Sequence, residues 1–391
     1  MSIPITYSLR SVAVRKGSAA MAIGGIALVV IVFATLLALG HGFEKAVATS
    51  GSEDNLIVLR KGADAELGSQ VFQDTGRIVR ELPLVARDEN NEPLFMFESV
   101  LILLLQKNNG GSANINLRGT DPDAYRVHRE VTVNEGRWFR PGTNEAIVGR
   151  ALGRRMDNLA VGQTIVAGKR EWKIVGFFDA QGSGLESEIW VDVHVLQAAF
   201  NRGNIYQSLL FRVSGDPQAA KKTLEATLDA DPRLRSIQVW TEKEYYRKQS
   251  ELMSSVITTL GTILSIIMSV GAIVGAMNTM YAAVAYRKRE IGCLLSMGFP
   301  PESIWLAFIF ESLLLSLCGA ALGCGISLMF DGIKTGTTNW ATFAETSFEF
   351  TMSWKILAES TGLALLLGFI GGFLPALQAA RMNAVDALRR A

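Results

Sequence analysis

The sequence predicts a membrane protein with four transmembrane helices and an extracytoplasmic α+β domain that carries a β-rich inserted subdomain. Four strongly apolar segments are close to or above the ~20 residues that a helix needs to cross a bilayer. They are residues 19–39, 252–285, 304–330 and 356–374. About 210 residues separate the first two segments, enough for a domain that buries its own core.

Charge next to the apolar segments predicts the orientation. The N-terminal segment, residues 286–303 and the C-terminal tail carry basic residues, whereas residues 331–353 hold three acidic residues and one lysine. The basic residues are Arg10, Arg15, Lys16, Arg287, Lys288, Arg289, Arg381, Arg389 and Arg390. Because positively charged loops stay in the cytoplasm, we expect both termini there and the large domain outside. No cleaved signal peptide is expected, since the first apolar run is long and no clear Ala-x-Ala site follows it.

The order of these segments gives the expected organisation. We expect a cytoplasmic amphipathic helix at residues 1–18, transmembrane helix 1 at 19–40, the external domain at 41–250, a stalk with transmembrane helix 2 at 251–285, a cytoplasmic helix at 286–303, transmembrane helix 3 at 304–330, an external loop at 331–353, transmembrane helix 4 at 354–377 and a cytoplasmic tail at 378–391. A helix from Glu242 to Tyr286 would be roughly 65 Å long, about twice the hydrocarbon thickness. It would leave the membrane as a rigid lever.

Short apolar runs between turn residues predict the strands of the external domain. We expect strands at 54–60, 84–87, 95–105, 114–118, 145–148, 164–167, 171–178, 188–192, 208–214 and 237–240, and helices at 66–82 and 217–228. Residues 112–200, approximately, form the expected insert, and the flanking elements favour a split α+β sandwich. This domain contains no cysteine, so that it must fold without disulfides.

Residues 286–303 predict a short amphipathic helix between two transmembrane helices. At helical spacing one stripe is shared by Tyr286, Glu290, Ile291, Leu294, Leu295 and Gly298. Gly298 can end this helix, and Pro300 and Pro301 prevent its continuation. The stripe favours a contact on the cytoplasmic face, with a solvated interfacial helix as the alternative.

Small and acidic residues mark the membrane helices. Gly271 with Gly275, and Gly319 with Gly323, are spaced for close approach of two helices and suit a dimer interface. Small residues are also common in membrane helices that do not dimerise. Glu311 in the third segment and Glu359 in the fourth are candidates for a function because intramembrane carboxylates are costly. Either could instead reach the membrane interface, which we favour for Glu359.

Several kinds of chemistry have no support in the sequence. The run Gly162–Arg170 differs from a phosphate-binding loop in its spacing and lacks Ser or Thr after Lys169, so a hairpin turn is expected there. The three histidines, His41, His128 and His194, do not form a recognisable metal motif. We therefore expect no catalytic, cofactor or metal residues in this chain. Basic residues cluster only beside the membrane segments, which argues against nucleic-acid binding.

Two cytoplasmic motifs carry a resemblance to a known family. The stretch Arg289-Glu290-Ile291-Gly292-Cys293-Leu294-Leu295-Ser296-Met297-Gly298 resembles the coupling loop of MacB/FtsX/LolC-type (type VII, mechanotransmission) ABC transporter permeases, with Leu295-Ser296 where that family has a second basic residue. Residues 371–381 and 386–389 resemble the closing motifs of these permeases, and Tyr7-x-x-Arg10 resembles their beginning. Residues 135–139, 174–178 and 188–192 are similar to the MacB-like periplasmic core domain.

The resemblance implies a non-catalytic permease subunit in the bacterial inner membrane. ATP and Mg would be held by a separate cytoplasmic ATPase, which contacts Arg287, Lys288, Arg289, Glu290, Ile291, Gly292, Leu294, Leu295 and Gly298. We expect Glu290, Ile291 and Leu294 to make that contact, and Arg287 and Lys288 mainly to hold the helix at the membrane surface.

The same resemblance implies further partners and a cargo. These are a second copy or a paralogous permease, membrane lipids and a periplasmic adaptor protein. A lipid, lipoprotein or amphiphile is the expected cargo, and an FtsX-like transducer that regulates an external cell-wall hydrolase is the alternative function.

Overall fold

The computed structural model describes residues 16–108, 110–340 and 342–383. The described chain forms two compact units. The helical unit consists of the residues up to His41, Ser255–Ile333 and the residues from Phe350 onward, and the α+β unit consists of Gly42–Ser254 and Lys334–Glu349. The helix expected at residues 1–18, the Tyr7-x-x-Arg10 pattern and the motif at residues 386–389 lie wholly or largely outside the described residues.

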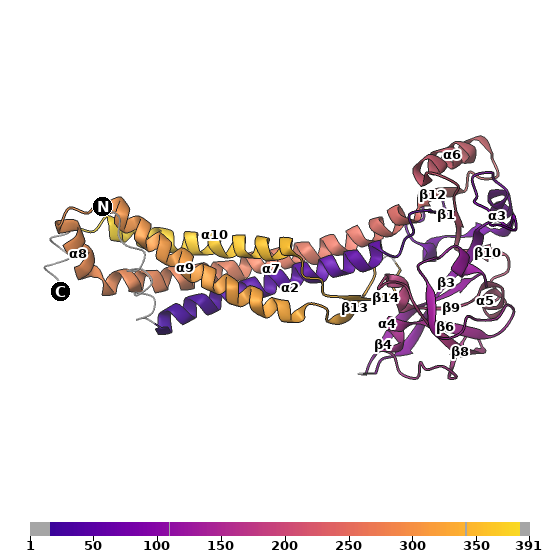
Figure 1. Cartoon of the computed structure of the whole chain (residues 1–391), viewed down its shortest axis with the longest axis horizontal. Coiled ribbons are helices and arrows are strands. Elements are labelled where there is room, and N and C mark those ends of the chain that lie inside the picture. Colours follow the sequence, from indigo (N-terminus) through magenta and orange to yellow (C-terminus); the bar gives the residue numbers. More distant parts are fainter. Residues whose placement is uncertain (1–15, 109, 341, 384–391) are drawn as a thin grey trace. The chain divides into compact units, whose positions relative to one another are not determined.

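Four long helices of the described chain are apolar enough to cross a membrane, as the sequence predicts. They are α2 (Lys16–Ala48), α7 (Glu242–Tyr286), α9 (Pro301–Ser327) and α10 (Trp354–Ala380), which are labelled in Figure 1. The short helix α8 (Lys288–Ser296) lies between α7 and α9. Helix α7 has the predicted bounds, and its first residues, up to Ser254, count with the α+β unit.

Glycines bring the helices of the helical unit close together. A Cβ added to Gly368 would lie 2.4 Å from the hydroxyl oxygen of Ser316, so α9 and α10 touch at this point without room for a side chain. A Cβ on Gly323 would lie 2.7 Å from the Cβ of Val30, and one on Gly319 would lie 3.0 Å from the Cβ of Ile26. Both of these α9 glycines therefore pack against α2 of the same chain.

This packing corrects the expectation that all four glycines of the two pairs face a second protein. Gly319 and Gly323 are buried within the helical unit, because close approach of α2 needs them. Gly271 and Gly275 on α7 have no described atom within 4 Å of an added Cβ, so that only this pair leaves its face open.

The α+β unit is built on one ten-stranded sheet with the order β12-β1-β11-β3-β4-β9-β6-β8-β5, and β7 pairs with β8. The strands are β1 (Asn55–Arg60), β3 (Phe95–Gln106), β4 (Ser112–Thr120), β5 (Thr132–Gly136), β6 (Glu145–Gly149), β7 (Thr164–Ala167), β8 (Arg170–Asp179), β9 (Glu188–Asp192), β11 (Ser208–Arg212) and β12 (Ile237–Thr241). Outside this sheet lie the pairs β2 (Val71–Phe72) with β10 (Ile205–Tyr206), and β13 (Lys334–Thr338) with β14 (Glu345–Glu349). The helices are α3 (Gln73–Arg80), α4 (Arg150–Gly153), α5 (Val193–Phe200) and α6 (Pro217–Ala230), with 3-10 turns η1 (Glu66–Gly68), η2 (Ala124–Arg126), η3 (Gly184–Ser187) and, in the helical unit, η4 (Leu328–Phe330).

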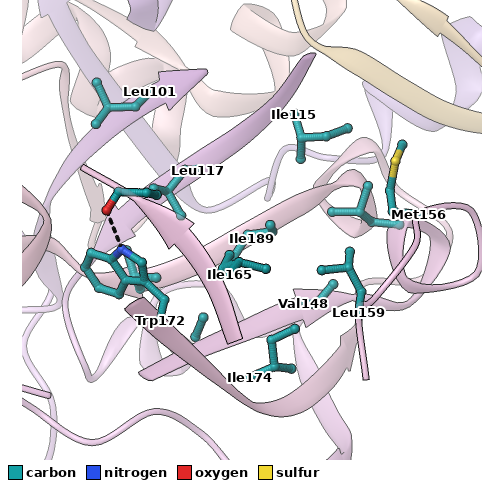
Figure 2. Close-up of a cluster of buried hydrophobic side chains, with 14 of the residues drawn as sticks. Leu101, Ile115, Leu117, Val148, Met156, Leu159, Ile165, Trp172, Ile174 and Ile189 are labelled. Atoms are coloured by element: carbon teal, nitrogen blue, oxygen red, sulfur yellow. Dashed lines mark hydrogen bonds between the residues drawn. The ribbon is translucent and has the colours of Figure 1, made fainter. Parts of the chain in front are cut away.

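Two hydrophobic cores lie on this sheet. The core of the insert surrounds Trp172, whose indole Nε1 donates a hydrogen bond of 3.1 Å to the carbonyl oxygen of Ala167 (Figure 2). The other core lies between β1, β11 and β12 and helices α3 and α6, and includes Leu224 and Phe211. Most of this core belongs to the insert, but the insert shares the sheet with the rest of the unit because β4 pairs antiparallel with β3.

Two local expectations were wrong. The expected helix at residues 66–82 is interrupted, because Val71 and Phe72 pair with β10 before α3 begins at Gln73. Residues 84–87 make only isolated bridges instead of a strand. The expected external loop at 331–353 contains the hairpin β13–β14, which groups with the α+β unit because Arg155 is paired with Glu345 and donates to the Ser347 hydroxyl at 2.6 Å.

The glycine contacts give a first test. We expect Gly323→Leu to destabilise the helical unit by about 1–3 kcal/mol, because the side chain must displace α2. Gly325→Leu is the matched control, since it adds the same side chain to α9 where no described atom lies within 4 Å of an added Cβ. Thermal unfolding of both variants in detergent measures the difference. Equal midpoints would show that α2 does not pack on Gly323.

Candidate functional site

Helix α8 is a separate helix because the helical backbone conformation is interrupted on both sides of it. Arg287 has φ −103° and ψ 15°, which interrupts the helical path after α7. At the other end Gly298 has φ +89°, a conformation that glycine adopts readily, and the Phe299 N–H donates to the Leu294 carbonyl at 3.1 Å. Pro301 then opens α9. The predicted roles of Gly298 and of Pro301 are confirmed.

One side of α8 is buried against the helical unit. Ile291 is only 3% exposed and belongs to a hydrophobic cluster with Met280 and Val284 of α7 and with Ile304 and Phe308 of α9. Gly292 is also buried, and Leu295 packs against this cluster. Ile291 is therefore an anchor of α8 on its own bundle. The expectation that Ile291 contacts another protein is not compatible with this burial.

A buried ion pair also holds α8 in place. The Arg287 Nη1 lies 2.9 Å from the Glu311 Oε2 of α9, and both side chains are largely buried. The Arg287 guanidinium also lies 5.9 Å from the centre of the Phe308 ring. Because a buried charge is costly without a partner, Arg287 and Glu311 depend on each other. Arg287 is thus a structural residue, contrary to the expected role at the membrane surface.

The opposite side of α8 is exposed. Tyr286 and Met297 are 82% and 67% exposed, and Glu290 and Cys293 are exposed between them. Leu294 is half-buried. Residues 290, 293 and 297 are spaced by three or four, so they share one face of α8, and Tyr286, the last residue of α7, lies exposed just before it. This exposed α8 face, defined by Tyr286, Glu290, Cys293 and Met297 with Leu294 at its edge, is the candidate functional site.

The remaining predicted residues lie outside this face or at its margin. Arg289 is exposed and Lys288 is half-buried. Glu359 is partly exposed near the beginning of α10, with its Oε1 3.9 Å from the Lys355 Nζ. That Glu359 reaches the edge of the membrane stays a prediction.

The α+β unit contains a polar cluster that sequence analysis missed. The guanidinium of Arg118 on β4 bonds to Glu66 at 2.8 Å, Glu98 at 2.9 Å and Glu188 at 2.7 Å, and all four side chains are buried. Burial alone would lower the pKa of Arg118, but the three carboxylates hold it well above its usual range. The cluster joins η1, β3, β4 and β9, elements that are far apart in the sequence.

His128 extends this cluster. Its Nδ1 lies 2.9 Å from Glu130 Oε1, and its Nε2 lies 3.6 Å from Glu98 Oε1. Burial opposes a charge on this ring, yet the hydrogen bond to Glu130 and the nearby Glu98 carboxylate raise the pKa of His128 well above its ordinary value. A protonated His128 supplies a second positive charge among these carboxylates. Within the described residues, no group of three or more His, Cys, Asp or Glu side chains could hold a metal ion.

The fold first defines a class. The chain has four apolar helices that are long enough to cross a membrane. An α+β domain lies between the first two in the sequence, and a short helix joins the second and third. This arrangement is that of an integral membrane protein. The FtsX-like permease C-terminal family matches residues 262–384, which include α8, and the MacB-like periplasmic core domain family matches residues 19–230. The chain therefore belongs to the MacB/FtsX-type permeases of ABC transporters.

Curated relatives agree with this assignment. The macrolide export ATP-binding/permease protein MacB of Bdellovibrio bacteriovorus is 25% identical over 97% of this chain and 60% of its own length. A MacB 2 protein of Aeromonas hydrophila is 28% identical over 70% of this chain and 43% of its own length. The ABC transporter permease YknZ of Bacillus subtilis is 26% identical over 68% of each protein. The chain thus spans about half the length of the MacB relatives.

One solved structure extends the comparison. The periplasmic region of MacB from Actinobacillus actinomycetemcomitans aligns with 52% of this chain and 92% of its own, at 13% identity and a TM-score of 0.38.

The Arg287–Glu311 pair gives a second test. We expect Arg287→Ala to destabilise the helical unit by about 3–5 kcal/mol, because it leaves Glu311 buried without its guanidinium partner. Arg289→Ala is the matched control, since Arg289 is the exposed arginine of the same segment. Thermal unfolding in detergent and protease cleavage near residue 287 measure the effect. If the two variants have equal stability, the ion pair does not hold α8.

Proposed function

We propose that this chain is the membrane subunit through which a cytoplasmic ABC ATPase moves the α+β unit on the other side of the membrane. The observation that carries the proposal is the two-sided character of α8. One side is anchored on the helical unit by Ile291 and by the Arg287–Glu311 pair, and the other side presents an exposed, partly apolar face. An anchored helix with an open face can receive a force and pass it on.

The anchoring determines where such a force goes. Arg287 follows the last residue of α7, and Glu311 belongs to α9, so α8 is tied to both of its neighbours. Helix α7 continues without interruption from Tyr286 back to Glu242, the residue that follows β12. A displacement of α8 would therefore act on α7 directly and on the α+β unit through the first turns of α7.

The orientation and the ATPase follow from the same proposal. Basic residues beside α8, including Arg289, favour the cytoplasm for this side of the membrane, and the termini then lie there as well. ATP and Mg would bind to the ATPase, whether it is a separate chain or an additional domain as in the relatives named ATP-binding/permease proteins.

A second permease completes the proposed assembly. The outer face of α7 around Gly271 and Gly275 carries exposed apolar side chains, among them Ile267 and Val274. Small residues let two such helices approach closely, so this face suits a second copy or a paralogous permease.

The proposed cargo is a lipid, a lipoprotein or another amphiphile, handed to an adaptor protein outside the membrane. Four helices per chain leave little room for a wide channel. The relatives named for macrolide export also support an amphiphilic cargo.

The exposed α8 face gives the third test. We expect Met297→Asp and Leu294→Asp each to weaken binding of the ATPase about thirty-fold, since loss of an interface anchor commonly costs about 2 kcal/mol. Glu290→Ala should weaken it less. The ATPase is first identified by co-purification with the full chain and then titrated, as a purified protein, against each variant in nanodiscs.

Glu302→Ala is the matched control, because Glu302 is an exposed acid in the first turn of α9 and lies outside the α8 face. Unfolding midpoints equal to those of the unsubstituted chain would establish that the aspartate variants are folded. Full ATPase affinity in folded Met297→Asp and Leu294→Asp would contradict the proposal.

A further inference from the structure

A hollow of about 450 Å³ lies in the α+β unit, and neither the family assignment nor the exposed α8 face explains it. Its walls come from α3, from the beginning of β3 and from residues 121–127 after β4. A volume of this size falls within the range of pockets that hold small organic molecules. We call it the α3–β3 pocket.

The floor of the α3–β3 pocket is apolar and open for a structural reason. It is formed by Leu94, Phe95, Met96 and Phe97. The pairing of β3 with β4 begins only at Ser99, so residues 95–97 have no β4 partner on that side. Instead, the Phe97 N–H donates to Asp121 Oδ2 at 3.2 Å. The turn after β4 therefore leaves this edge of β3 open, and Phe95 and Phe97, which pack on the core, remain partly exposed.

Helix α3 contributes two arginines to the lining of the α3–β3 pocket. Arg77 and Arg80 are one turn apart and line the pocket together with Gln73, one turn before Arg77. Arg77 is 66% exposed, and its ion pair with Asp74 is 3.8 Å long to a carboxylate that is 92% exposed. Arg80 lies 3.8 Å from Glu92, and its Nε is buried without a hydrogen-bond partner among the described residues.

The other charges of the pocket also have partners. Arg126 is paired with Asp88 and lies 3.6 Å from Asp123. Asp121 accepts the Phe97 N–H and lies 3.9 Å from the His194 Nε2. Arg77 and Arg80 lie in the last turn of α3, where basic residues complement the helix dipole. This preference accounts for the position of the two arginines on α3. It does not account for a hollow beside them or for the unpartnered Nε of Arg80.

We propose that the α3–β3 pocket binds an amphiphile whose anionic group lies between Arg77 and Arg80 and whose apolar part covers Phe95 and Phe97. Guanidinium groups bind carboxylates and phosphates through several parallel donors, and Arg77, which is 66% exposed, and Arg80 both line the pocket. This inference rests on the proposed function, because the pocket would hold the amphiphilic cargo on the α+β unit.

Photolabelling of the full chain in nanodiscs tests this proposal. The probes are three diazirine-bearing molecules with the same sixteen-carbon chain: a carboxylic acid, an alcohol and an amine. Adducts on residues 73–97 are counted by mass spectrometry relative to adducts on α10, which report the probe dissolved in the membrane. We expect at least about tenfold more pocket adducts for the acid than for the alcohol or amine, as hydrogen bonds to charged groups predict.

Variants separate the arginines from the rest of the pocket. Arg77→Glu should lower the labelling by the acid about tenfold. Gln73→Glu places a negative charge on the same face of α3 without removing an arginine, and should act in the same direction. Arg233→Glu is the matched control, because Arg233 is also an exposed arginine of the α+β unit and does not line the pocket.

Three results would overturn the proposal. Equal labelling by the three probes would refute the anionic group, and absence of pocket adducts would refute the site. Unchanged labelling in Arg77→Glu and Gln73→Glu would refute the role of α3. Binding of the ATPase to α8 is measured on the same preparations. If the unsubstituted chain does not bind the ATPase, the proposed function is contradicted and the labelling result remains valid. Intact ATPase binding without pocket labelling would contradict only this inference.

Discussion

The ion pair between Arg287 and Glu311 is the interaction on which the account of the helical unit depends. It connects the residue after α7 to the third turn of α9, across 24 residues of sequence. Two charges buried together are costly to separate, so the pair resists any movement of α8 away from its neighbours. Ile291 adds an apolar anchor on the same side. The helix is thereby fixed on one side and left free on the other.

Buried ion pairs also hold the elements of the α+β unit together. Arg118 gathers carboxylates from three other elements, and the His128 Nε2 lies 3.6 Å from Glu98 Oε1. Breaking this cluster would leave several charges unpaired in the interior, so that these elements are expected to move as one body. A rigid unit is suited to being moved from one end. The hairpin β13–β14, bound through Glu345 to Arg155 and Lys107, connects α9 and α10 to this unit as well.

Local patterns in the sequence predict much of this structure. Apolar length gives the four helices, and Glu242 and Tyr286 are the observed ends of α7. Gly298 and Pro301 mark the limits of the helices around the turn because their backbone preferences are local. Interactions between distant residues could not be predicted in this way. The stripe containing Ile291 and Glu290 gave no sign of which residue faces the bundle, and Gly319 differs from Gly271 only in the helix that lies beside it.

The most direct measurement is a cross-linking scan along α8 in the complex with its ATPase. A photoreactive amino acid is placed at each position from 286 to 297 in turn, and adducts with the ATPase are quantified. The account predicts a helical pattern with maxima at Glu290, Cys293 and Met297 and a minimum at Ile291. A maximum at Ile291, or uniform labelling along the helix, would contradict the claim that α8 is anchored on one side and binds its partner with the other.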